Sequence, residues 1–261
     1  MHHKFDLFSD YFALRDTALS RVDPRVKATV ALAVIVAVVL SGQAVFPLLV
    51  AGCCIGTLLA LRVPARLLLL RLAAPLGIAA VICLLRPFFV EGEPILTIPV
   101  WGWRLTATRA GVLDGLLIAC RVVGAVSAMI LLAMTTPAHR IFAVLRWAHL
   151  PRTLVETAML MYRYIFALLD HASDAVSAAR IRLGFSSPRR ALSSMGMVAG
   201  AVLTRSMEQA ERTHEAMTCR GYRGELPLGH LDPLSRRSLA ALLGGPAAVA
   251  LLYLLFEFVL I

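Results

Sequence analysis

The side chains best suited to specific binding chemistry in this sequence are arginines placed at two expected helix ends. Arg180 and Arg182 stand shortly before Gly184, and Arg220 directly precedes Gly221. A guanidinium group is permanently charged and can hold a carboxylate through two parallel hydrogen bonds, which favours docking onto an acidic surface. The alternative is simple capping, because cations stabilise the negative end of a helix and glycine readily adopts the left-handed conformation that ends it.

Two long amphipathic helices are predicted to carry these arginines. Apolar residues recur at three- and four-residue steps from Leu154 onwards, which predicts a one-faced helix that stops near Gly184. The same periodicity predicts a second helix from about residue 189 to residue 220, with Glu208 and Arg212 paired on its polar face. We expect both helices to lie outside the membrane, in an insert that spans residues 136–236.

The remainder of the chain is strongly hydrophobic. Apolar residues make up 59% of its 261 residues, which is too many for a soluble domain. A hydrocarbon core about 30 Å thick needs roughly 20 apolar residues per helix, and suitable runs predict spans at residues 26–41, 44–61, 67–89, 108–134 and 238–256. The predicted fold class is an all-α polytopic membrane protein with about five transmembrane helices. Residues 1–135 would hold a surface segment and four spans, and residues 237–261 the fifth.

The distribution of basic residues predicts the orientation. The net charge is +10, and the positive-inside rule accounts for it without nucleic-acid binding. Bases are dense before the first span, between spans two and three, and in the insert, where fourteen Lys or Arg residues stand against eight acids between residues 139 and 237. These segments are therefore expected in the cytoplasm, together with the N-terminus, whose aromatic residues in segment 4–27 suit the membrane surface.

Two ionisable residues fall inside the fourth predicted span. Asp114 and Arg121 lie seven residues apart on one helix face, and an ionisable pair within a membrane is a functional hypothesis by default. We favour a structural ion pair, because a proton or metal pathway needs a chain of acids. Glycines spaced by four residues also permit close helix contacts with a partner: these are Gly52 with Gly56, and Gly111 with Gly115.

The sequence offers little support for catalysis or for a resident metal. Its five cysteines show no CxxC spacing, so free thiols are expected and no disulfide or zinc site is predicted. The segment Met1-His2-His3 could chelate copper or nickel, but its predicted cytoplasmic position is unsuited to metal capture. Paired carboxylates and an activated nucleophile are both missing near the insert. We therefore predict neither catalytic residues nor a cofactor, and expect that the protein is not an enzyme.

Several segments resemble the transmembrane T component of energy-coupling factor (ECF) transporters, and more closely its CbiQ branch, which serves cobalt and nickel uptake. The likeness covers nearly the whole chain. The resemblance rests on residues 20–27 before the first span, Tyr162 to Asp170, Ala179 to Gly184, and Glu211 to Gly224. The last of these blocks is the most specific. The resemblance implies a subunit of the bacterial cytoplasmic membrane that transmits motion from a pair of partner ABC-type ATPases to a separate substrate-binding membrane component, with a possible small accessory subunit.

The same resemblance implies where the ATPases dock. In that family the arginine of an Ala-Arg-Gly motif at each helix end inserts into a groove on one ATPase subunit. Arg220 matches the second motif, although Cys219 stands where the family usually has Ala. The first motif falls either on Ala179-Arg180-Ile181 or on Arg182 two residues later. Cobalt is the expected cargo, nickel or another micronutrient the alternative, and a membrane enzyme acting on an anionic lipid the alternative from another class.

Overall fold

The structure is a computed structural model that describes residues 22–61, 63–90, 94–100, 103–224 and 236–259. Most of the surface segment predicted at residues 4–27 and the segment Met1-His2-His3 therefore lie outside the described residues. The chain divides into two compact units. Among the described residues, one unit comprises residues 142–224 and the other comprises residues 22–141 and 236–259. The predicted boundaries at residues 136 and 236 stay predictions.

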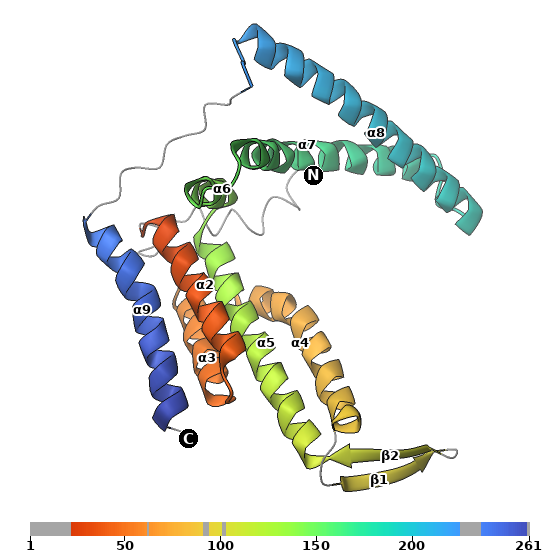
Figure 1. The fold of residues 1–261 in the computed structure, drawn as a ribbon. Coiled ribbons are helices and arrows are strands. Elements are labelled where there is room, and N and C mark those ends of the chain that lie inside the picture. Colours follow the sequence, from red (N-terminus) through yellow and green to blue (C-terminus); the bar gives the residue numbers. More distant parts are fainter. Residues whose placement is uncertain (1–21, 62, 91–93, 101–102, 225–235, 260–261) are drawn as a thin grey trace. The chain divides into compact units, whose positions relative to one another are not determined.

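The unit of residues 22–141 and 236–259 contains the helices that correspond to the five predicted spans (Figure 1). They are α2 (Pro24–Leu40), α3 (Val45–Ala60), α4 (Ala65–Phe89), α5 (Arg109–Thr135) and α9 (Arg236–Val259). We call this part the membrane unit. Between α4 and α5 the chain forms an antiparallel hairpin of β1 (Pro94–Val100) and β2 (Trp103–Thr108), so this segment departs from the all-helical pattern of the rest.

The lengths and compositions of these helices confirm a polytopic membrane protein. Segments of α4, α5 and α9 are long and apolar enough to cross a membrane, and α3 is a shorter apolar helix. Helix α2 has 17 residues, the lower limit for a span of roughly 17 to 25 residues. It begins two residues before the predicted start at residue 26, where Asp23 accepts a hydrogen bond from the backbone N–H of Arg25 and Pro24 occupies the first turn.

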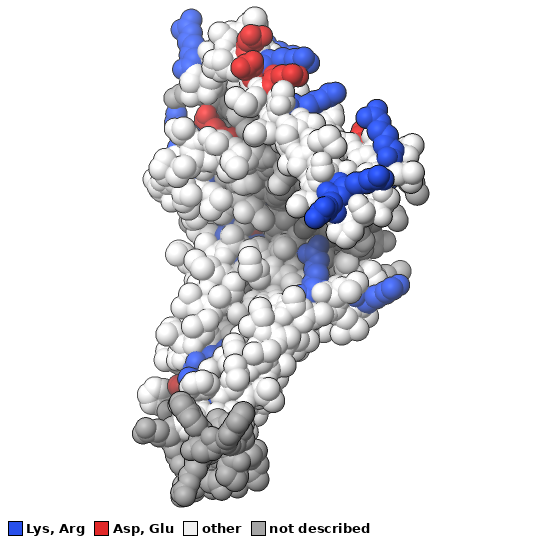
Figure 2. All heavy atoms as spheres, turned by 90° about the vertical axis from the view of Figure 1, so that its right-hand side faces the viewer, with Lys and Arg blue, Asp and Glu red and all other residues white. Residues whose placement is uncertain are grey.

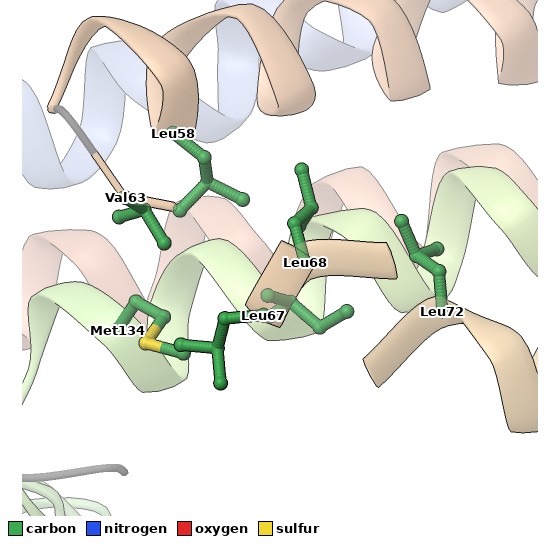
Figure 3. Packing of buried hydrophobic residues seen from close by; sticks show 7 residues of the cluster. Leu58, Val63, Leu67, Leu68, Leu72 and Met134 are labelled. Carbon is green, nitrogen blue, oxygen red and sulfur yellow. The ribbon is translucent and has the colours of Figure 1, made fainter. Parts of the chain in front are cut away.

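Helix α5 is the central helix of the membrane unit. It packs against α2, α3 and α4, while α9 packs against α2. Leucines dominate the contacts between α3, α4 and α5 at one end of α5, as Figure 3 shows for the main apolar cluster. The fully buried members of the unit include Leu58 in this cluster and Val38 in a second cluster beside Phe46. Phe46 also makes ring contacts with Tyr253 and Phe256, which fasten α9 to the α2–α3 hairpin.

One of the two glycine pairs brings helices of this chain together. A methyl group built on Gly111 would lie 2.6 Å from the Cα atom of Pro87, and one built on Gly115 would lie 3.2 Å from the Cα atom of Cys83. Helices α4 and α5 therefore approach each other closely at backbone level. The pair Gly111 and Gly115, predicted to serve contacts with a partner, packs within the chain instead.

We expect Gly111→Ala to destabilise the membrane unit by about 1–3 kcal/mol, the usual cost of overfilling a packed contact. The new methyl group would meet backbone atoms of α4, which cannot rotate away. Gly52→Ala is the matched control, because nothing lies within 4 Å of its added methyl group. Thermal unfolding of both variants in detergent measures the difference. Equal melting temperatures would mean that α4 and α5 do not need this close approach.

The other unit consists of long helices that are charged along one side. Helix α6 (Ala138–Trp147) crosses the boundary of the units, and α7 (Arg152–Ile181) and α8 (Pro188–Cys219) follow. We call α7 and α8 the coupling helices, after the role that the resemblance to ECF T components implies for them. They are 30 and 32 residues long and match the two predicted amphipathic helices closely. A six-residue connection makes them a helical hairpin, whose bend we call the corner (residues 180–190).

Candidate functional site: the ends of the coupling helices

The end of α7 is a Schellman motif, in which two backbone N–H groups after the helix bond back to its last carbonyls. The Gly184 N–H donates to the Ala179 carbonyl at 2.8 Å, and the Leu183 N–H donates to the Arg180 carbonyl at 3.0 Å. Arg182 is the C-cap residue. Leu183 has a φ of 54°, the left-handed conformation that completes this motif. The left-handed residue is therefore Leu183, one position earlier than the glycine that the sequence indicates as the stop.

The end of α8 repeats this motif. The Tyr222 N–H donates to the Met217 carbonyl at 3.0 Å, and the Gly221 N–H donates to the Thr218 carbonyl at 2.9 Å. Arg220 is the C-cap residue, and Gly221 takes the left-handed conformation with a φ of 82°. Here the sequence predicted the cap correctly, because glycine carries no Cβ atom to oppose a positive φ.

The two motifs show which arginines are equivalent. Arg182 and Arg220 are both C-cap residues, each followed by a left-handed residue, whereas Arg180 lies two residues before the cap inside α7. All three side chains are exposed. The geometry therefore pairs Arg182, rather than Arg180, with Arg220. It also shows that backbone N–H groups after each helix bond two of its last carbonyls, so neither cap depends on its guanidinium group for these two bonds.

A buried serine fixes the corner between the coupling helices. The Ser194 hydroxyl donates to the Gly184 carbonyl at 2.9 Å, and Ser194 is only 3% exposed. A methyl group on Gly184 would collide with the Ser194 Oγ atom and would lie 2.9 Å from the Ala179 carbonyl oxygen. Gly184 is thus needed for close approach rather than for a positive φ. Nothing in the sequence pattern singled out Ser194, since serine within a helix is common.

The corner places the two C-cap arginines far apart. Arg182 precedes the first residue of α8 by six residues, and Arg220 follows its last residue. Ser194, which is tied to Gly184, lies 26 residues before Arg220, so a rise of 1.5 Å per residue separates the two arginines by on the order of 40 Å. Farther along the hairpin, the Thr213 hydroxyl donates to the Tyr164 hydroxyl at 2.9 Å and links α8 to the middle of α7.

The coupling helices expose large apolar side chains although they carry many charges. Ile181 and Leu192 are 84% and 78% exposed, and further exposed members of the set are Met161, Ile165, Leu183, Met195, Met197, Leu203 and Met207. Exposed apolar patches of large side chains mark interaction sites in proteins. The helix pair therefore offers an apolar surface along its length and basic groups at its ends.

The predicted ion pair of Asp114 with Arg121 is not formed. Residues seven apart on a helix are separated by about 10.5 Å along its axis. Asp114 instead lies 3.9 Å from Arg86 of α4, which the antiparallel packing of α4 and α5 brings alongside. Arg121 donates through both Nε and Nη2 to the Ser41 carbonyl, with a distance of 2.9 Å from Nε. Arg121 thus stabilises the C-terminal end of α2, in agreement with the negative end of a helix dipole.

Among the residues that the structure describes, no group of three or more His, Cys, Asp or Glu side chains could hold a metal ion. Cysteines 53, 54, 83, 120 and 219 are free thiols. The Glu208–Arg212 pair is present at 3.9 Å between exposed side chains, so it contributes little to stability. The coupling helices present exposed guanidinium groups at both ends and exposed apolar side chains between them.

Fold and site together define a polytopic membrane protein with a pair of long helices that expose arginines at their ends and apolar side chains between them. The family model described as CbiQ, cobalt transport protein, matches residues 15–230. The chain belongs to this family, the CbiQ branch of the T components of ECF transporters.

Three relatives illustrate the relationship. An uncharacterized protein of Methanocaldococcus jannaschii is 30% identical over 213 residues, which cover 80% of this chain and 79% of that protein. The cobalt transport protein CbiQ of Salmonella typhimurium is 30% identical over 160 residues, 60% of this chain and 71% of that protein. A putative fused cobalt transport protein CbiMQ of Methanocorpusculum labreanum is 31% identical over 123 residues, 46% of this chain and 20% of that protein.

Proposed function

We propose that the protein is the coupling subunit of an ECF-type importer for cobalt ion. In this role it binds two ABC-type ATPase subunits in the cytoplasm and passes their ATP-driven motion to a separate membrane component that holds the substrate. The observation that carries the proposal is the repeated cap geometry, which presents Arg182 and Arg220 as exposed equivalents at opposite ends of α8. ATP hydrolysis takes place in the partner subunits, and this chain catalyses no reaction.

The distance between the two arginines supports a bivalent attachment. A span on the order of 40 Å, from the rise of 1.5 Å per helical residue, is suited to two grooves on separate protein subunits and too long for one groove. Because a guanidinium group grips a carboxylate bidentately, each contact can persist while the subunits move. Closure of the ATPase pair on ATP would then displace the two helix ends relative to one another and tilt the coupling helices.

The exposed apolar surface of the coupling helices supports a second partner. Docking of the ATPase through an arginine occupies only the end of a helix. Side chains such as Met161, Leu192 and Met207 leave further apolar area exposed along the length of α7 and α8. This surface fits the substrate-binding membrane component, with a small accessory membrane subunit as a further partner. The description of the Methanocorpusculum labreanum relative as a putative fused cobalt transport protein is in line with association between cobalt transport components.

The location that fits this role is the bacterial cytoplasmic membrane. The basic segments of the sequence would face the cytoplasm together with the N-terminus, and the β1–β2 hairpin between α4 and α5 would face outside. The coupling helices would then lie on the side where ATP is available.

Reconstitution tests the proposed function. The full chain is placed in liposomes with the cobalt-type ATPase and the substrate-binding component, and uptake of cobalt ion is measured with and without ATP. We expect ATP-dependent uptake only when the chain is present, and competition with nickel ion reports the preferred cargo. Uptake that is equal without the chain would overturn the coupling role. Turnover of an anionic lipid by the purified chain alone would instead support the membrane-enzyme alternative.

A further inference from the structure

The corner between the coupling helices carries a concentration of positive charge that the two C-cap arginines do not explain. Arg180 and Arg182 come from the end of α7, and Arg189 and Arg190 come from the first turn of α8. All four side chains are exposed. The corner, residues 180–190, contains these four arginines and no acidic residue, so it has a charge of +4. On the face that Figure 2 shows, Lys and Arg side chains project from the surface at several points.

Two of these arginines stand where the physics of an isolated helix disfavours them. The first turn of a helix is its positive end, which favours Asp and Glu and opposes Lys and Arg by ~0.3–1 kcal/mol per charge. Helix α8 has no acid in its first turn, and Arg189 and Arg190 occupy it. The Arg190 guanidinium reaches Ser186 at 3.1 Å, a neutral hydroxyl, and the structure gives neither arginine an acidic partner among the described residues. Local rules broken in this way point to a functional site.

The other end of α8 has a different charge balance. Residues 208–224 contain Glu208, Glu211 and Glu215 against Arg212, Arg220 and Arg223, three acids and three bases, so this stretch has no net charge. The two docking ends therefore share their cap geometry but differ in their electrostatic fields. An acidic groove would attract the corner over a Debye length of about 10 Å at 0.1 M salt, whereas it would meet a locally neutral surface at the other end.

We propose that Arg189 and Arg190 extend the docking site of Arg182 and bind an acidic rim around the groove of the ATPase subunit. This inference rests on the proposed function and deepens it. The corner is the end that captures the ATPase by electrostatic attraction. The Arg220 end attaches through short-range contacts of a single guanidinium group. Ser194 makes this possible, because its bond to Gly184 holds the end of α7 and the first turn of α8 together as one surface.

Binding kinetics of the full chain in nanodiscs test the proposal, with the nucleotide-free cobalt-type ATPase as the probe. Charges at the rim of an interface mainly alter association rates and salt dependence. We expect Arg189→Glu and Arg190→Glu together to lower the association rate constant about tenfold at 0.05 M salt and less than about twofold at 1 M, where the Debye length is about 3 Å. The dissociation rate constant should change little. Loss of folding is not a concern, because glutamate suits the first turn of α8 better than arginine does.

Controls separate the possible outcomes. Arg205→Glu makes the same change of charge as Arg189→Glu on an exposed residue of α8, outside the corner, and should alter the association rate far less. Equal effects of Arg189→Glu and Arg205→Glu would overturn the inference, as would an effect seen only in nanodiscs with anionic lipid, since the corner would then bind headgroups. Failure of the wild type to bind the ATPase, or indifference to Arg182→Glu and Arg220→Glu, would instead overturn the proposed function.

Discussion

Arg182→Glu should reduce retention of the ATPase about a hundredfold or more, because losing one of two linked attachment points forfeits an avidity of roughly 10²–10⁴. The reversed charge would also repel the acidic groove that we propose as its partner. Arg220→Glu should have an effect of the same order, since both residues hold the C-cap position of a Schellman motif. Co-purification from detergent with the cobalt-type ATPase measures the retained fraction.

Arg180→Glu is the matched control for this experiment. It makes the same charge change two residues away, but its side chain leaves α7 from inside the last turn rather than from the cap. We expect a reduction of less than about tenfold, the size of a long-range charge effect on association. A loss as large as that of Arg182→Glu would show that Arg180 is the anchor and that equivalence of the caps does not decide the docking residue. Circular dichroism of each variant should match that of the wild type.

The membrane unit was largely predictable because its helices obey a single strong rule. Segments such as residues 67–89 and 108–134 are apolar over the length of a bilayer, and the structure places α4 and α5 there within a few residues. The end of α8 followed from capping chemistry for the same reason, since Gly221 is the residue that a left-handed cap favours. Local rules of this kind act within a few residues and can be found in one sequence.

Contacts between distant segments were not predictable in this way. The sequence suggested that Asp114 pairs with Arg121, but the partner of Asp114 is decided by the antiparallel packing of α4 and α5, which brings Arg86 alongside. Arg121 likewise bonds a carbonyl of residue 41, eighty positions earlier. No periodicity within one helix encodes these choices.

The structure of the corner depends both on local capping rules and on contacts between residues that are distant in the sequence. Its glycine was recognised, but as a residue with a positive φ, whereas the structure assigns that conformation to Leu183. Gly184 is required because Ser194 packs against it, and that contact depends on how α8 folds back on α7. The choice between Arg180 and Arg182 depended on the same detail, because a helix that ended two residues earlier would make Arg180 the C-cap residue. The sequence alone therefore left both arginines as candidates.

Gly184→Val should open the corner and weaken ATPase binding about tenfold or more, although it changes no charge. The new side chain would collide with the Ser194 hydroxyl and the Ala179 carbonyl oxygen, so the bond from Ser194 to the Gly184 carbonyl would break. Leaving such buried groups unpaired costs about 1–3 kcal/mol. Hydrogen exchange of the peptide that spans residues 180–194 measures the effect, and we expect exchange faster by roughly 5- to 150-fold, the range that this free energy corresponds to.

Two further variants show whether the corner acts as a unit. Gly196→Val introduces the same side chain into α8 where nothing lies within 4 Å, and should leave exchange and binding unchanged, because valine is no worse than glycine inside a helix. Ser194→Ala removes only the hydroxyl bond and should give an intermediate effect of about 1 kcal/mol. If Gly184→Val speeds exchange but leaves ATPase binding at the wild-type level, Arg182 docks without support from the corner. Its C-cap position alone would then be enough to present it to the acidic groove.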